Sequence, residues 1–248
     1  MKEIIDSINL PKQILDKAEK VISTLLGPSA KEIGEMFADR IRYKRLKNQM
    51  TIFSKTSDLL KKNKLQAREL NLKTLVPLIE QSSLEEDEIL QDKWANLITN
   101  ISSTPETGLE PKLIKTLSNL STLEAQVLDY IYDKFVTERQ NKFEKYKDSK
   151  YKYLSYNSID DVKIEYVTIE LKWIKQRFEL TEDFAKICID NLEALGLIHY
   201  EEPEIEIENN SRNEVQDDEM GQYVDLDVYA TYNPSEDFNL TTYGHYFI

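Results

Sequence analysis

The amino-acid sequence predicts a mainly α-helical protein, with an N-terminal helical domain followed by a C-terminal winged-helix domain that carries a small antiparallel β-wing. Three observations support this prediction. The 248 residues include only six glycines and seven prolines, which disfavours a turn-rich all-β fold. Apolar residues recur at spacings of three and four over much of residues 10–135. After residue 164 the order becomes helix, helix, glycine, strand, loop and strand, which is typical of a winged helix.

The N-terminal domain is expected to span residues 1–120 as a series of amphipathic helices. Apolar positions in residues 10–26 fall on one helical face, and Gly27-Pro28 ends that pattern. Pro77 must lie in the first turn of its helix or kink it. Three segments match the capping box, in which a serine binds a free backbone amide and a glutamate reaches back to the serine. These predicted helix starts are Ser29-x-x-Glu32, Ser83-x-x-Glu86 and Ser121-x-x-Glu124.

The C-terminal domain is expected at residues 121–248, with residues 121–135 as its first helix. A charged, tyrosine-rich insertion is expected at about residues 136–160, which could be a helical extension followed by an exposed loop. The alternative is that this segment is the linker before a domain that starts near residue 155. Thr181 can cap a later helix, and Gly196 fits the glycine that ends it.

Charge is distributed very unevenly along the chain. Residues 200–238, which include the expected wing, contain thirteen acids and one base, and so carry −12 of the net −13. Residues 36–74 contain eleven bases and three acids, about +8. An acidic total disfavours non-specific binding to nucleic acid or anionic lipid, except through the basic block.

No catalytic chemistry is visible, so we expect no enzyme activity, no metal and no cofactor. The single cysteine, Cys188, excludes an internal disulfide or a thiolate zinc cluster, and His199 and His245 lack ligand spacing. Neither a phosphate-binding glycine loop nor a Gly-x-Ser-x-Gly motif is present. The acids Glu85–Glu88 fit a solvated helix N-terminus better than a pair of catalytic carboxylates. No apolar run is long enough to cross a bilayer, and a cytoplasmic location is expected.

Two charged segments are candidate binding surfaces. The first is basic and could follow a phosphate backbone, or instead be a solvated face or dock on acidic segments of the same chain. The second is an acidic partner surface in the wing. The basic candidates are Arg40, Arg42, Tyr43, Lys44, Arg45 and Lys47. The acidic candidates are Glu204, Glu206, Glu208, Asp217, Asp218 and Glu219.

The charges of the expected winged helix oppose DNA binding. In DNA-binding members the second helix of the motif enters the major groove. Here residues 181–195 contain four acids and only one base, Lys186, and the wing is the most acidic part of the chain. Acids that face phosphate are repelled and release no counterions. Such a module suits contact with protein.

Three segments of the first half carry a resemblance to a known family. They are GPSAKEIGE from Gly27, DRIRYKRLKN from Asp39 and, most specifically, LVPLIEQSSLEEDEILQDKWANLITN from Leu75. Over about residues 10–130 the chain resembles the abortive infection alpha family, a prokaryotic group linked to phage resistance. The resemblance implies a mostly helical protein with a defence role in the bacterial cytoplasm, and it transfers no catalytic residues.

Three functions remain open from the sequence. The leading hypothesis is a non-enzymatic antiphage protein that recognises a protein partner: a phage component, a second defence protein, or a second copy of this chain in a homodimer. The alternative is a nucleic-acid-binding regulator or defence factor that uses the basic 40–47 block. A membrane-acting effector that uses the amphipathic 14–26 stretch is a third, although no stable membrane insertion is expected.

Overall fold

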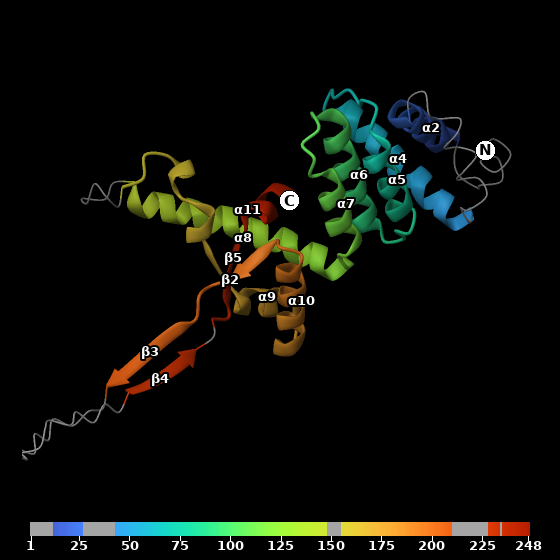
Figure 1. Ribbon diagram of the computed structural model, residues 1–248. Coiled ribbons are helices and arrows are strands. Elements are labelled where there is room, and N and C mark those ends of the chain that lie inside the picture. Colours follow the sequence, from blue (N-terminus) through green and yellow to red (C-terminus); the bar gives the residue numbers. More distant parts are fainter. Residues whose placement is uncertain (1–11, 27–42, 148–154, 210–227, 234) are drawn as a thin grey trace, which may run out of the picture. The chain divides into compact units, whose positions relative to one another are not determined.

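The computed structural model describes residues 12–26, 43–147, 155–209, 228–233 and 235–248 (Figure 1). The chain forms two compact units, Met1–Ala125 and Gln126–Ile248. As predicted, it is mainly helical, with a small antiparallel sheet of three strands near the C-terminus.

The N-terminal unit is built from helices. Helix α4 contacts α2 on one side and α6 on another, and α7 contacts α5. Trp94 of α6 and Phe53 of α4 are among its largest fully buried side chains. The helices are α2 (Lys12–Leu26), α4 (Tyr43–Lys62), α5 (Leu72–Ser82), α6 (Glu88–Ser103), α7 (Glu110–Ser118) and the start of α8 (Thr122–Tyr146).

The amphipathic helix α2 is part of this core. Its apolar residues Ala18, Val21 and Leu25 are buried, and α4 is the helix it contacts. An ion pair of 2.7 Å between Lys17 Nζ and an oxygen of Asp58 also joins the two helices. A membrane-acting effector would need this apolar face for lipid, whereas here the face is covered by protein.

Two of the three predicted capping boxes lie in the described residues, and one of them is correct. Ser121 Oγ accepts a hydrogen bond from the Glu124 amide, and the Glu124 carboxylate accepts one from the Ser121 amide at 2.7 Å. The box predicted at Ser83 is wrong, because α6 begins at Glu88 and is capped by Asp87, which accepts bonds from the amides of residues 89 and 90. The Ser29–Glu32 box lies outside the described residues.

Ser83 instead ends the preceding helix, α5. Its hydroxyl donates to the Glu80 carbonyl at 2.7 Å and accepts a bond from Arg45 Nε at 2.8 Å, so it has no part in starting α6. Pro77 lies in the middle of α5 and not in its first turn. There it leaves the carbonyl of Lys73, four residues earlier, without its usual helical amide partner.

The C-terminal unit combines helices with two small sheets. Strands β1, β5 and β2 form an antiparallel sheet with β5 in the middle, and β3 and β4 form a separate antiparallel ribbon. The elements after α8 are the 3-10 turns η3 (Ile159–Asp161) and η4 (Ile164–Tyr166), β1 (Thr168–Glu170), α9 (Leu171–Phe178), α10 (Glu182–Ala194), β2 (Ile198–Tyr200), β3 (Glu204–Asn209), β4 (Val228–Asn233), β5 (Asp237–Leu240) and α11 (Thr242–Phe247).

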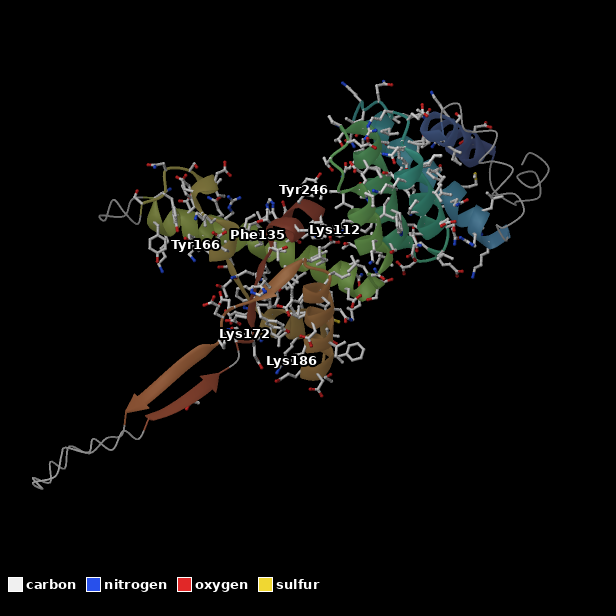
Figure 2. All side chains as sticks on the ribbon, viewed as in Figure 1. Lys112, Phe135, Tyr166, Lys172, Lys186 and Tyr246 are labelled. Atoms are coloured by element: carbon white, nitrogen blue, oxygen red, sulfur yellow. The ribbon has the colours of Figure 1, made fainter. Side chains whose placement is uncertain are left out.

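Two basic residues of the predicted 136–160 insertion bind backbone carbonyls of the segment before β1. Helix α8 continues to Tyr146, which confirms the helical extension. Arg139 Nε donates to the Val162 carbonyl at 2.9 Å, and Lys142 Nζ donates to the carbonyl of Tyr166, which is labelled in Figure 2. These cations fasten the segment before β1 to α8.

Helix α10 begins and ends at the predicted residues. Thr181 Oγ1 accepts the Phe184 amide at 3.4 Å, and Gly196 follows the helix with φ +74°, in the left-handed region that favours glycine. One side of α10 is buried, and the helix contacts α9 and β2. The sheet residues Ile169, Ile198 and Phe238 are buried as well. The buried residues of the helix itself are Ala185, Cys188, Ile189 and Leu192.

Candidate partner-binding surfaces

Two residues of the basic surface predicted at 40–47, Lys44 and Arg45, make contacts within their own unit. Lys44 is exposed, and its Nζ lies 2.5 Å from a carboxylate oxygen of Glu86. Arg45 donates from Nε to Ser83 Oγ at 2.8 Å and from Nη2 to the Glu80 carbonyl at 3.3 Å. Arg45 therefore binds the C-terminal end of α5, where helix carbonyls lack amide partners.

The remaining residues of that block are placed as follows. Tyr43 is the first residue of α4, and Lys47 is exposed on the same helix. Arg40 and Arg42 lie outside the described residues. The two best-defined bases thus contact an acid and a helix end of their own unit, which weakens the case for a phosphate-binding face at this position.

The predicted acidic surface is only partly described. Glu204, Glu206 and Glu208 lie in β3, where their Cα partners in β4 are Asn233, Thr231 and Tyr229. The other three candidates, Asp217, Asp218 and Glu219, lie outside the described residues.

Helix α10 carries an exposed apolar pair. Phe184 is 55% exposed and Ile187 is 52% exposed, although the opposite side of the same helix is buried. The two residues are three positions apart, so they are neighbours on the helix surface. The sequence alone did not single out either residue as exposed. Both residues are offset from the buried row formed by Ala185, Ile189 and Leu192, but this offset alone does not show which side of the helix faces the core.

The charged residues around this pair are mostly acidic. Glu182 and Asp183 begin α10, and its one base, Lys186 (labelled in Figure 2), pairs with two carboxylates. Lys186 Nζ lies 2.7 Å from Glu236 and 3.1 Å from Glu182, while Lys175 Nζ lies 2.8 Å from Glu182. Hydrogen bonds to Glu236 and Glu182 raise the pKa of Lys186, and bonds from Lys175 and Lys186 lower the pKa of Glu182. The charge of the single base of α10 is therefore balanced by the carboxylates of Glu182 and Glu236.

Acids also meet at the end of the three-stranded sheet. Glu170 of β1 is directly opposite Asp237 of β5, and the Glu201 amide donates to the Asp237 carbonyl at 2.9 Å. Burial raises the pKa of Asp237, and repulsion by Glu170 and Glu201 raises it further. An ionised Asp237 therefore costs the folded state free energy.

We predict that Asp237→Asn raises the free energy of unfolding at pH 7 by about 0.5 kcal/mol, the scale of a solvent-screened like-charge pair across strands. The cost of ionised Asp237 is absent below the unfolded-state pKa of about 3.9 and fully present above the raised folded-state pKa. The gain should therefore disappear as the pH falls below about 4. Urea unfolding at pH 7 and pH 3 measures both values. The control Glu236→Gln breaks the pair with Lys186 and should give no gain at pH 7, and a gain for Asp237→Asn that persists at pH 3 would contradict the explanation.

The two histidines are placed apart from each other and in different surroundings. His199 has a side chain that is 75% exposed, with Nδ1 3.2 Å from a Glu193 oxygen. The His245 ring packs 5.3 Å from the Phe135 ring and 5.9 Å from the Tyr132 ring, between centroids. Within the described ranges, no group of three or more His, Cys, Asp or Glu side chains could hold a metal ion. The same ranges contain no helix that is both long enough and apolar enough to span a bilayer.

Comparison with known proteins gives one match. The family model described as abortive infection alpha matches residues 38–248, which include both units. Neither the search of curated proteins nor the search of solved structures returned a match.

Proposed function

Because this chain belongs to the abortive infection alpha family, whose membership implies phage defence, we propose that it is a non-enzymatic antiphage protein that binds a protein partner through α10. It acts in the bacterial cytoplasm. Its C-terminal unit is a winged helix whose recognition surface is adapted to polypeptide.

The order of the elements supports the winged helix. Helix α8 is followed by β1, α9, α10 and β2, then by a two-stranded ribbon and by β5, which pairs with both β1 and β2. In this arrangement α10 takes the position of the helix that enters the major groove in DNA-binding members. The β3–β4 ribbon takes the position of the wing.

The exposed pair Phe184 and Ile187 on α10 is the observation on which the proposal depends. A helix that binds DNA needs bases to neutralise phosphates, and α10 offers one lysine, which is already paired with two acids. A half-exposed aromatic ring beside an aliphatic side chain is instead the kind of anchor found at the centre of protein interfaces.

The charges around the anchor restrict the partner. Glu182 and Asp183 lie on the turn of α10 that precedes Phe184, and Glu236 is joined to α10 through Lys186. A partner that covers Phe184 should therefore have an apolar pocket bordered by lysine or arginine. A phage component and a second defence protein are the two sources of such a partner, and a homodimer is an outcome that the experiment below can detect.

A photocrosslinking amino acid at position 187 tests the proposal in infected cells. We expect crosslinks to a polypeptide that depend on phage infection or on a co-expressed defence protein. The control places the same crosslinker at Leu72, which is 53% exposed on the N-terminal unit and matches Ile187 in exposure and aliphatic character. Crosslinks from position 187 to nucleic acid, or identical products from both positions, would overturn the proposal, while a product of twice the chain mass would identify a homodimer.

A further inference from the structure

Opposite charges gather at opposite ends of the α4–α6 pair. The two helices run in the same direction: Lys44 pairs with Glu86 before α6 begins, Lys55 pairs with Asp92 at 2.6 Å, and the Arg68 amide beyond α4 donates to Ser102 near the end of α6. The acidic turn at residues 85–88 therefore lies beside the start of α4. The far end of α4 is distant from those acids.

Three exposed lysines occupy this far end. Lys61 and Lys62 lie in the last turn of α4, and Lys64 follows after one intervening residue, Asn63. None of the three lies in an ion pair with a described residue, whereas Lys44 and Lys55 of the same helix both do. The nearby Arg68 adds charge, although its guanidinium donates to the carbonyls of Thr104 and Ile101.

Lys64 stands where glycine would be expected. The Leu65 amide donates to the Leu60 carbonyl at 2.9 Å, and the Lys64 amide donates to the Lys61 carbonyl at 3.2 Å, which is the Schellman pattern of helix termination. Lys64 has φ +56°, in the left-handed region where side chains other than that of glycine are strained. The chain thus has a third cation beside Lys61 and Lys62 in spite of an unfavourable backbone conformation.

The acids at residues 85–88 do not neutralise this cluster, and Asp58, one turn before Lys61 on α4, is already paired with Lys17. From Lys44 to Lys61 the helix rises about 25 Å, at roughly 1.5 Å per residue. The screening length at physiological ionic strength is only about 8 Å. The lysines therefore present a local positive potential to solvent, despite the acidic total of the chain.

We propose that Lys61, Lys62 and Lys64 form a binding site for the phosphate backbone of a nucleic acid. Lysines are flexible point charges, so the site reads charge and not sequence. It differs from the basic 40–47 block, in which Lys44 and Arg45 contact their own unit. The lysine site and the α10 surface consist of different residues, and each has its own variants, so either proposal can fail without the other.

The full chain and a fluorescent 20-base-pair DNA duplex test this site by anisotropy between 50 and 200 mM salt. Three phosphate contacts should give a slope of log affinity against log salt of about −2.7. The triple variant Lys61→Gln, Lys62→Gln, Lys64→Gln should lose on the order of a hundredfold in affinity at low salt and nearly all of the slope. The matched control, Lys20→Gln, Lys47→Gln, Lys115→Gln, removes the same charge from exposed positions on three separate helices and should retain binding.

A single variant covers the risk that the triple variant misfolds. Lys64→Gly relieves the left-handed backbone, so it should unfold at a higher urea concentration than the parent chain. Its salt slope should nevertheless change by about 0.9, from about −2.7 to about −1.8, because one phosphate contact is lost. Unchanged affinity in either variant would overturn the proposal. Equal competition by polyglutamate at matched charge would overturn it as well, because the cluster would then bind acidic polypeptide.

Discussion

Replacing Phe184 and Ile187 together with aspartate should abolish phage protection while the protein stays folded. Each side chain is a candidate interface anchor, and losing an anchor costs about 2 kcal/mol or more of binding free energy. Two such losses weaken binding by about a thousandfold. The fold should survive, because both residues are more than half exposed and the buried side of α10 is unchanged. Plaque counts on cells that carry the variant and the thermal midpoint of the purified protein measure the two effects.

A matched control variant separates the effect of removing the apolar pair on α10 from the effect of adding two negative charges. Leu72→Asp with Leu84→Asp also replaces two exposed apolar residues, 53% and 59% exposed, but on the N-terminal unit. It adds the same two negative charges and should leave protection intact. Equal loss of protection in both variants would remove the special role of α10, as would full protection by the Phe184/Ile187 variant.

The features of α10 that depend on neighbouring residues were predictable from sequence. A threonine before the helix, acids in its first turn and a glycine after its end are local signals, and each acts through backbone groups within a few residues. For the same reason the Ser121–Glu124 box is correct. In such cases no distant residue competes for the side chain that makes the signal.

The prediction at Ser83 was wrong because a distant residue does compete. Arg45 lies 38 positions earlier, yet its guanidinium binds Ser83 and the end of α5. Once that contact forms, Ser83 belongs to the end of one helix, and Asp87 starts the next. The contact of Arg45 could not be predicted from the basic 40–47 block either, since a base that binds a helix end within its own unit looks identical in sequence to a free one.

The exposed pair on α10 could not be assigned from periodicity alone. Phe184, Ala185, Ile187, Cys188, Ile189 and Leu192 cover more than half of the helix surface, so the pattern does not say which side faces the core. The side of α10 that faces the core is set by its packing against the sheet. Because α10 rests on a sheet of only three short strands, one side of the helix is buried and the remaining apolar residues are left at the surface.

The start of α11 lies unusually close to the loop that follows α10. The Thr241 amide donates to the Leu197 carbonyl at 3.1 Å, and its hydroxyl donates to the Gly196 carbonyl at 2.6 Å. The same hydroxyl accepts the Gly244 amide at 2.8 Å and so caps α11. Gly244 is buried in this contact, and a Cβ atom there would lie 1.9 Å from the Leu197 carbonyl oxygen and 2.7 Å from its carbon.

Gly244→Ala should therefore destabilise the C-terminal unit by about 3 kcal/mol or more, at the upper end of the range for overpacked sites, since the overlap is with backbone that cannot rotate away. Gly196→Ala is the comparison: it has φ +74° but open space around its Cβ, so only backbone strain of about 1 kcal/mol is expected. Urea unfolding measures both. Similar losses would mean that α11 can move away from Leu197, and α11 would then contribute little to holding β2 and β5 together. A much larger loss for Gly244→Ala, accompanied by loss of phage protection, would show that the contact between α11 and the start of β2 maintains the sheet on which α10 rests.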